Sequence, residues 1–337
     1  MSQAPETILV YVGLDLTGDG LMKLPFVRAL RSAFPKSHIT WLAGKGATVY
    51  AGKLAPIVRG LIDEVIDNAG IGSRSGEILG RPLPGRRFDL ILDTQRRLVT
   101  TLVLRRIAHD RFVSGCAGYL LSDVRPAGAL RLSYRKPPAM IDQMLELVAL
   151  ASAGRPDAPL NTGGRVELPE VVRVEAARLL PERGRYVALA PGAGDRVKCW
   201  PLSRFIALGS RLVDQDLVPV FLLGPEDTEW ETSLRSELPG ARLPLSEPGT
   251  ALELEPLLTI ALAERCAACV ANDSGGGHLL AASGTPLVSL FGPTSPAKFA
   301  PRVPQLTVIE ADDYGSRDMN AIPVEAVETA VRAYCST

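Results

Sequence analysis

The chain has 337 residues, 46% of them hydrophobic, and its 37 basic side chains balance its 37 acidic ones. This length predicts two domains rather than one, each with a full hydrophobic core. A formal net charge of zero excludes a protein whose overall field attracts nucleic acid, so we expect no nucleic-acid partner.

Terminal and cysteine patterns indicate a soluble, cytoplasmic protein. Residues 1–6 carry no secretory signal, and no apolar run is long enough to span a membrane. Cys266 and Cys269 form a C-x-x-C pair, but they lead into an apolar strand and have no second pair nearby. Core packing is therefore favoured over metal binding or redox chemistry for both thiols.

Short apolar runs alternate with helical periodicity in the first half. Thr7–Gly13 has the continuity of a buried parallel strand, and Leu21–Phe34 repeats apolar residues at helical spacing until Pro35. The later elements expected here are strands at Ile39–Ala43, Val65–Ile66, Leu90–Asp93 and Phe112–Ser114 and helices at about Arg96–Ala108 and Ala139–Ala153. This alternation predicts a doubly wound parallel sheet.

The alternation restarts after the Gly- and Pro-rich segment Gly154–Arg165, which marks a domain boundary. The strands expected in this half are Tyr186–Ala190, Val218–Leu223, Ala267–Ala271, a run from Leu287, and Leu306–Ile309, and the helices are Glu170–Leu180, Leu202–Val213, Glu226–Leu238, Leu252–Glu264, His278–Ser283 and Val324–Tyr334. We predict an N-terminal domain over residues 1–160, a C-terminal domain over 161–320 and a final helical segment over 321–337.

Positive charge is concentrated in the first domain. Ile71–Lys136 contains twelve Arg and one Lys against five acidic residues, an excess of eight. The pattern favours a basic face for an anionic partner, although ordinary solvated helix charge explains it equally well. Within this region Gly70–Arg87 holds five glycines and two prolines and predicts a long loop.

The sequence from Asn272 to Pro296 has the pattern of an anion-binding site, and it reads N-D-S-G-G-G-H-L-L-A-A-S-G-T-P-L-V-S-L-F-G-P-T-S-P. An apolar run ends at Asn272 and Asp273, and glycines then precede a helix. Glycines allow close backbone approach, and the N–H groups at a helix start attract negative charge. Asp273 can accept hydrogen bonds from ligand hydroxyls, so a diphosphate carrying a sugar fits. The candidate ligands that follow it are Ser274, Gly275, Gly276, Gly277 and His278.

Three further strand ends carry polar residues. Gly18 and Asp19 follow the first strand, where Asp19 suits either chemistry or a helix cap. Pro191–Pro201 reads P-G-A-G-D-R-V-K-C-W-P, so its small residues, Arg196 and Lys198 suggest a phosphate cradle, with a solvated surface lysine as the plainer interpretation of Lys198. Glu226 suits ribose hydroxyls, but a helix cap is favoured. The backbone-contact candidates of these loops are Gly18, Gly192 and Ala193.

Asn272–Pro296 resembles the ADP-heptose:lipopolysaccharide heptosyltransferases, glycosyltransferase family 9, whose pattern is D-S-G-x-x-H-L-A-A-x-x-G-T-P-x-x-x-L-F-G-P-T. The matching positions are Asp273, Ser274, Gly275, His278, Leu279, Ala281, Gly284, Thr285, Pro286, Phe291, Gly292, Pro293 and Thr294. Other family motifs are similar to Gly18-Asp19 with Leu24-Pro25, to Phe88–Gln95, to Pro191–Pro201 and to Met319–Val327. The resemblance covers nearly the whole chain, and the order of its motifs is more specific than any single one.

The resemblance implies a GT-B fold, in which two Rossmann-like domains face a cleft and the last helix packs back on the N-terminal domain. It also implies an inverting transfer from ADP-heptose without an obligatory metal or other cofactor. Asp19 would be the general base, and Lys198 would neutralise the leaving diphosphate. The amides of residues 274–277, with His278, would hold that diphosphate, while Asp273 and Thr294 would contact the donor.

The implied acceptor is an anionic glycolipid, a lipopolysaccharide core precursor, and its use implies peripheral contact with the inner face of the cytoplasmic membrane. Gly276 and Gly277 stand where the family has Pro-Met, which leaves the donor sugar open. The alternatives are a family member with another nucleotide sugar or acceptor, a nucleotide-sugar-binding protein without catalysis, and a GT-B sugar-nucleotide epimerase.

Overall fold

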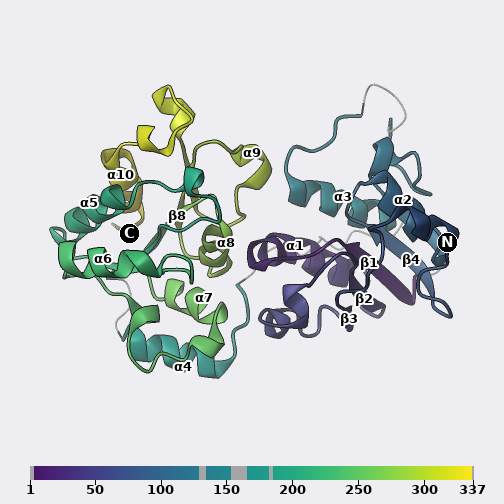
Figure 1. Ribbon diagram of the computed structural model, residues 1–337, viewed down its shortest axis with the longest axis horizontal. Helices are drawn as coiled ribbons and strands as arrows, with labels where there is room; N and C mark the ends of the chain where they lie inside the picture. Colours follow the sequence, from purple (N-terminus) through teal and green to yellow (C-terminus); the bar gives the residue numbers. More distant parts are fainter. Residues whose placement is uncertain (1–3, 129–133, 153–164, 182–184, 336–337) are drawn as a thin grey trace. The chain divides into compact units, whose positions relative to one another are not determined.

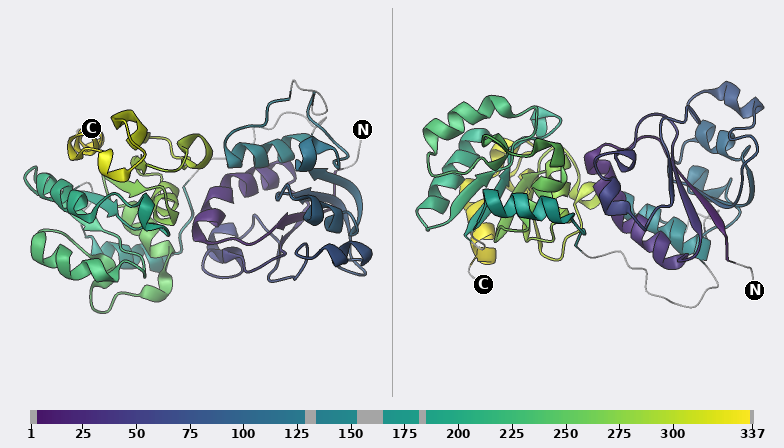
Figure 2. Two further views of the ribbon diagram at one scale, coloured as in Figure 1. Left: turned by 45° about the horizontal axis from the view of Figure 1, so that its top comes forward. Right: turned by 90° about the horizontal axis from the view of Figure 1, so that it is seen from below.

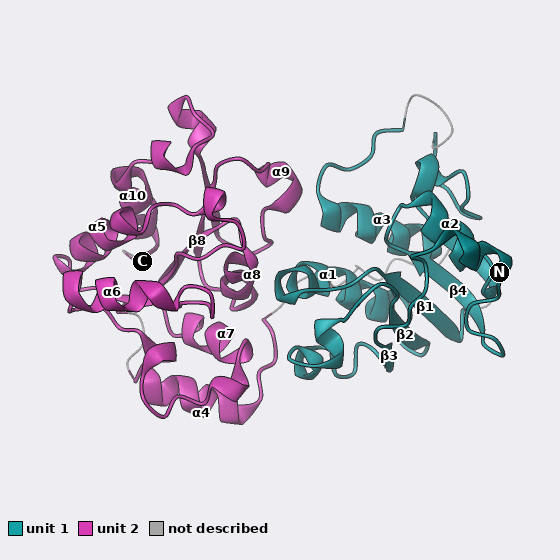
Figure 3. Ribbon diagram, viewed as in Figure 1, with its two compact units in different colours: residues 1–163 teal, residues 164–337 magenta. Residues whose placement is uncertain are grey.

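The computed structural model describes residues 4–128, 134–152, 165–181 and 185–335. The chain forms two compact units, residues 1–163 and 164–337 (Figure 3). Each contains a parallel sheet with helices packed against it (Figures 1 and 2). The boundary predicted at residue 160 lies outside the described residues.

In the described part of unit 1, the sheet has the strand order β3-β2-β1-β4-β5. Its elements are β1 (Thr7–Val12), α1 (Thr17–Ala33), β2 (His38–Ala43), β3 (Glu64–Ile66), β4 (Arg87–Asp93), α2 (Leu98–Leu104), β5 (Ala108–Ser114) and α3 (Met140–Ser152), with 3₁₀ turns η1 (Val49–Ala51), η2 (Ala55–Val58), η3 (Ser75–Leu79) and η4 (Cys116–Tyr119). The central strand β1 is apolar because it is buried: residues 8–12 have no exposed surface. Leu9 and Tyr11 point to one face of the sheet, where they pack with Leu104 of α2.

In the described part of unit 2, the sheet has the order β10-β9-β8-β6-β7. Its strands and helices are α4 (Glu170–Leu179), β6 (Tyr186–Ala190), α5 (Leu202–Val213), β7 (Val218–Phe221), α6 (Glu231–Glu237), α7 (Leu257–Ala263), β8 (Ala268–Asn272), α8 (Gly275–Ala282), β9 (Leu287–Phe291), α9 (Pro296–Phe299), β10 (Leu306–Glu310) and α10 (Val324–Cys335). The 3₁₀ turns are η5 (Arg196–Lys198), η6 (Thr228–Trp230), η7 (Pro244–Ser246), η8 (Leu252–Leu254), η9 (Ala311–Tyr314) and η10 (Met319–Ala321). Cys266 and Cys269 are buried, and burial raises the pKa of the Cys266 thiol to about 12, as expected for core packing.

The final helix, α10, packs within the core of unit 2, and its contact with the N-terminal domain stays a prediction. Val327 and Val331 of α10 are fully buried in the core of unit 2. The helix lies against α5 and the sheet of that unit, where Arg211 binds Glu328 at 2.9 Å. An amphipathic pattern predicts that a helix buries its apolar face, but it does not say against which sheet.

Other differences concern element boundaries. Helix α1 begins at Thr17 and α8 at Gly275, each several residues earlier than predicted, so the glycines of both loops lie in helical turns. Helix α2 ends at Leu104, because β5 begins at Ala108. The predicted helix over Glu226–Leu238 is a 3₁₀ turn followed by α6. No helix in the described residues is long and apolar enough to cross a membrane.

Candidate functional site

The strand orders place a topological switch point in each unit. In unit 2 the chain leaves β6 toward β7 on one side and β8 toward β9 on the other, so the loops after β6 and β8 diverge. Ligands of open α/β sheets bind at the carboxyl ends of strands at such points. Asn272, which is buried, joins the two loops, since its amide donates to Pro191 O at 2.7 Å and accepts from the Trp200 amide at 3.0 Å.

Three predicted ligands meet beside this point. Lys198 in η5 places Nζ 3.2 Å from Asp273 Oδ2, and the Thr294 hydroxyl donates to the same oxygen at 2.7 Å. They come from the loops after β6, β8 and β9, which the parallel sheet brings to one edge. The Asp273 side chain is only 9% exposed, whereas the Lys198 side chain is 31% exposed. The lysine is therefore the more accessible partner, while the carboxylate is largely buried and accepts from Thr294.

Helix α8 starts immediately beyond Asp273. Ser274 is its N-cap, and the Ser274 hydroxyl accepts from the Gly277 amide at 3.3 Å. Gly275 and Gly276 occupy the first turn, where backbone N–H groups have no partner within the helix. His278 follows in the same turn and is partly buried. The structure therefore gathers the predicted anion ligands at the start of an eight-residue helix.

Of the remaining predicted residues of this unit, Gly192 and Ala193 lie in the loop after β6, and Glu226 lies in the loop after β7. Gly192 lies against Asp227 so closely that a Cβ would come within 1.9 Å of the Asp227 carboxylate, and Ala193 follows it in the loop. Arg196, expected to join Lys198 in a phosphate cradle, instead binds Asp227 at 3.0 Å and stacks on the Trp230 ring at 4.4 Å. Glu226 is exposed, and its carbonyl accepts from Arg196.

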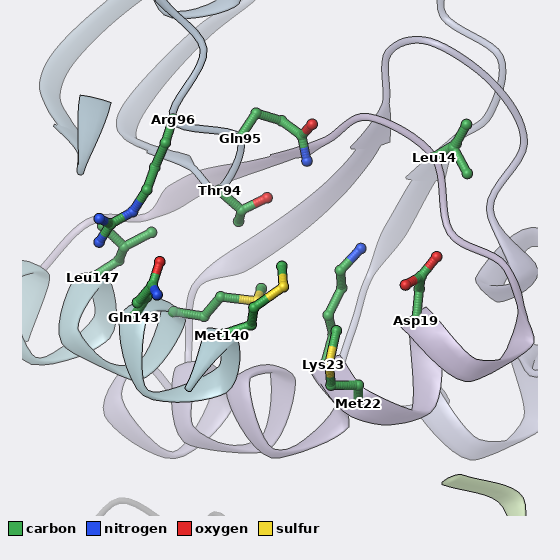
Figure 4. Close-up of a pocket in the computed structure, with 11 residues that line it drawn as sticks. Leu14, Asp19, Met22, Lys23, Thr94, Gln95, Arg96, Met140, Gln143 and Leu147 are labelled. Carbon is green, nitrogen blue, oxygen red and sulfur yellow. The ribbon is translucent and has the colours of Figure 1, made fainter. Parts of the chain in front are cut away.

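Unit 1 has its switch point between β1 and β4, and a cavity of about 200 Å³ lies beside it. Figure 4 shows Thr94, Gln95 and Arg96 from the loop after β4 facing α1 and α3. The side chains that line the cavity are Leu14, Asp19, Met22, Lys23, Thr94, Gln95, Arg96, Met140, Gln143, Met144 and Leu147. Asp19 is thus the predicted residue that this cavity contains, and Gly18 precedes it in the first turn of α1.

Local contacts position Asp19. It is the third residue of α1, and its carboxylate accepts from the Leu16 amide at 3.4 Å, which is a helix-capping contact. One turn later, the Lys23 ammonium contacts Asp15, a buried carboxylate that also accepts from Trp41 Nε1 at 3.0 Å and from the Thr48 hydroxyl. These contacts anchor α1 to β2, and so fix where Asp19 projects.

Among the described residues, no group of three or more His, Cys, Asp or Glu side chains is arranged to hold a metal ion. Lys198 supplies a positive charge beside the start of α8, 3.2 Å from Asp273. Asp93 is buried at the end of β4, where desolvation raises its pKa, while Thr101, the Gln95 amide and Ser114 donate to it. It fixes the loop that carries Arg96.

The description of a known family, glycosyltransferase family 9 (heptosyltransferase), matches residues 78–322. The chain belongs to glycosyltransferase family 9. Lipooligosaccharide heptosyltransferase 2 of Haemophilus influenzae is 24% identical to it over 315 residues, covering 89% of this chain and 88% of that protein.

Solved structures agree with the GT-B fold expected of the family. A family 9 glycosyltransferase from Veillonella parvula superposes with a TM-score of 0.73 at 21% identity, over 100% of this chain and 99% of that one. The ADP-heptose LPS heptosyltransferase II of E. coli gives 0.68 at 22% identity, over 98% of both chains. The resemblance seen in the sequence is confirmed, and the chain is a glycosyltransferase of this family.

Sequence reasoning about this glycosyltransferase missed most of the unit 1 cavity. Thr94 and Arg96 follow β4 as Asp19 follows β1, so the strand-end rule contained a signal for them. Met140 and Gln143 had no such signal, because α3 is separated from α1 by more than 100 residues and packs against it only in the fold.

Proposed function

We propose that this protein is an inverting glycosyltransferase that moves a heptose from ADP-heptose to an anionic glycolipid of the lipopolysaccharide core. The observation that carries the proposal is the group formed by Lys198, Asp273 and Thr294 at the start of α8. It combines donors for a diphosphate with acceptors for sugar hydroxyls. The similar E. coli protein is named for ADP-heptose, which supports this donor.

In the proposed reaction, the acceptor hydroxyl oxygen forms a bond to the anomeric carbon while the bond from that carbon to the diphosphate oxygen breaks. Asp19 takes the hydroxyl proton. ADP leaves with the electron pair, and negative charge grows on its diphosphate. The N–H groups of Ser274 to Gly277, with His278 and Lys198, stabilise that charge without needing a metal ion.

The remaining contacts serve binding. Asp273 accepts hydrogen bonds from the donor sugar, and Thr294 orients the Asp273 carboxylate. The backbones of Gly192 and Ala193 approach the nucleotide, and the exposed Glu226 is available to its ribose. Gly18 holds the first turn of α1 beneath the acceptor.

Membrane contact is part of the proposal, because the acceptor is a glycolipid. Around α2, Leu79, Leu98 and Leu120 are 89%, 56% and 56% exposed. Arg106 donates to Gly80 O at 3.4 Å and Arg105 to Leu121 O at 2.7 Å, so these leucines flank one helix. Exposed leucines among arginines are typical of a surface that touches an anionic bilayer. We infer peripheral contact at the inner face of the cytoplasmic membrane.

The decisive experiment compares Asp19→Asn with the native protein. Thermal stabilisation by ADP-heptose, UDP-glucose and GDP-mannose identifies the donor, since stabilisation grows with ligand affinity. The variant should keep the native donor response and lose turnover about 10²–10⁴-fold with a lipopolysaccharide core acceptor. Native turnover in the variant would exclude Asp19 as the base. Product from donor alone, without acceptor, would indicate an epimerase instead.

A further inference from the structure

Arg96 has an unusual backbone conformation beside the unit 1 cavity. Its φ is 52°, in the left-handed region that side chains other than glycine seldom adopt. Such conformations persist where the surrounding structure enforces them, and they cluster at binding sites. Arg96 lines the cavity that contains Asp19 (Figure 4). Only about a fifth of its side chain is exposed.

The segment after β5 is shaped around the Arg96 guanidinium. Arg96 Cζ lies 5.7 Å from the centre of the Tyr119 ring. Tyr119 itself has a φ of 68°. A Cβ at Gly115 would come within 2.6 Å of Cζ and Nε of Arg96, so that backbone lies directly against the guanidinium. The ring of Tyr119, itself a left-handed residue, and the backbone of Gly115 thus hold the Arg96 guanidinium in place.

The guanidinium nevertheless keeps hydrogen-bonding capacity. In the described residues, its buried NH2 nitrogen has no hydrogen-bond partner. Glu146 Oε2 is 3.9 Å away, and this oxygen already accepts from the hydroxyls of Tyr119 and Tyr134. Buried polar nitrogens without a partner are rare, and arginine has five N–H donors to satisfy. The described residues therefore leave part of the hydrogen-bonding capacity of Arg96 unused, on a side chain that lines the cavity.

The rest of the cavity suits a small polar ring. Of the two described cations that line it, Lys23 is in contact with the buried Asp15, whereas Arg96 has only the more distant carboxylate of Glu146, at 3.9 Å, so Arg96 is the better placed of the two to bind an anion. Gln95 and Gln143 add amide groups, and three methionines supply an apolar wall. A volume of about 200 Å³ is below the range of about 300–1,000 Å³ for drug-sized ligands, so the cavity fits one sugar unit rather than a whole glycolipid.

We propose that Arg96 binds an acidic group, carboxylate or phosphate, on the acceptor sugar and thereby orients the reacting hydroxyl toward Asp19. A guanidinium forms paired hydrogen bonds with both kinds of group. This specificity role rests on the proposed function for the identity of the acceptor site. It also explains why a strained, deeply held arginine lies in the same cavity as the proposed base.

The chain carries its own reporters for a test. Three of its five methionines, Met22, Met140 and Met144, line the cavity, while Met319 is buried in unit 2. Protein labelled with ¹³C at the methionine methyl groups is titrated with methyl glucuronide and with methyl glucoside, which differ in the acidic group. Glucose 6-phosphate and glucose form the second matched pair, and inorganic phosphate is titrated alone.

We expect an acidic sugar to shift the cavity methionine signals saturably, with an affinity at least tenfold higher than that of its neutral partner. The Met319 signal should not move. Arg96→Gln should remove this preference, and Arg97→Gln, which changes an exposed neighbouring charge, should keep it. Whichever acidic sugar binds identifies the group as carboxylate or phosphate.

Equal shifts from acidic and neutral sugars, no shift from any sugar, or an unchanged preference in Arg96→Gln would overturn the proposal. Dispersed methionine signals in the variant establish that it is folded. The donor is absent from these titrations, so the result is independent of whether ADP-heptose is the donor. Conversely, the Asp19→Asn experiment can fail while the acidic-sugar preference holds.

Discussion

Lys198 and Asp273 form an ion pair of 3.2 Å, although they are 75 residues apart in the sequence. Both residues were predicted to contact the donor. The lysine is the more exposed partner, so it can turn from the carboxylate to a diphosphate without uncovering Asp273, which Thr294 continues to hold.

Lys198→Gln should therefore lower kcat by about 10²–10³-fold, as expected when one fixed stabiliser of a leaving group is removed. Steady-state kinetics with the donor identified by thermal shift provides the measurement. Lys298→Gln removes another exposed lysine of the same unit and should leave kcat unchanged. Full activity in Lys198→Gln would mean that the helix amides suffice.

Gly192→Ala should destabilise unit 2 because its Cβ would meet Asp227 at 1.9 Å. Displacing Asp227 breaks its contacts with Arg196 and with the Gly224 amide. We expect unit 2 to lose about 1–3 kcal/mol of unfolding free energy and the donor response to weaken. Gly194→Ala is the matched control, since its Cβ would meet nothing within 4 Å. Equal denaturant midpoints for the two variants would contradict the prediction.

The glycine pair at the start of α8 should respond unequally to alanine. At Gly277 a Cβ would lie 2.8 Å from the Asn272 carbonyl, so the helix must move away from β8. At Gly276 the nearest atoms are 3.4 Å away, and alanine adds up to about 1 kcal/mol of helix propensity. Gly277→Ala should lower both stability and donor affinity, and Gly276→Ala should preserve both. Calorimetric titration with ADP measures the affinity of each variant. A higher affinity in Gly277→Ala than in Gly276→Ala would contradict the prediction.

Glu64 makes unit 1 sensitive to acid. Its carboxylate accepts from Arg86 at 2.8 Å and 2.5 Å and from Thr40, and the bond with Arg86 is the main reason that its pKa falls to about 2. The pKa of Glu in an unfolded chain is about 4.3, so this contribution is complete above that pH and is lost as pH falls toward 2.

Glu64→Gln should accordingly show a smaller loss of unfolding free energy between about pH 5 and 2 than the native chain. Solvent screening limits the effect, since a third of the Glu64 side chain is exposed. Denaturant unfolding across this range measures it, and Glu237→Gln, at an exposed site of unit 2, should follow the native curve.

Membrane contact should depend on the leucines around α2. Leu98→Ser with Leu120→Ser should weaken sedimentation with vesicles that contain phosphatidylglycerol by about tenfold or more, because each buried leucine contributes roughly 1.5–3 kcal/mol. Val174→Ser changes a side chain of unit 2 that is 59% exposed and should have no effect. Native binding that neither the leucine changes nor added salt reduces would place the contact elsewhere.

Local pattern was sufficient to predict most strands and to select the residues that we propose bind the donor. The apolar runs at β1, β6 and β8 are continuous because both sheet faces are covered, and the motif around Asp273 lies within one strand–helix unit. The local pattern did not reveal which distant segments of the chain contact one another. Strand order, the packing of α10 and the cavity wall supplied by α3 depend on contacts between segments far apart in the sequence.

The start of α8 shows a second limit. Glycine has low helix propensity, so Gly275 to Gly277 suggested a turn before the helix. In the fold the Ser274 cap and the close approach to Asn272 override that propensity. The error concerned three residues, yet it decides whether these amides belong to a loop or to a helix end.

The buried Asp15 has a consequence for its neighbour along α1. Lys23 stands four residues after Asp19, which is the spacing at which a carboxylate and an ammonium pair on a helix surface. Asp15 captures that ammonium from beneath, together with Trp41 and Thr48. The buried Asp15 thus keeps the Lys23 ammonium away from Asp19, the proposed base. We expect Asp15→Asn to free Lys23 to form an ion pair with Asp19, which would make Asp19 a weaker base.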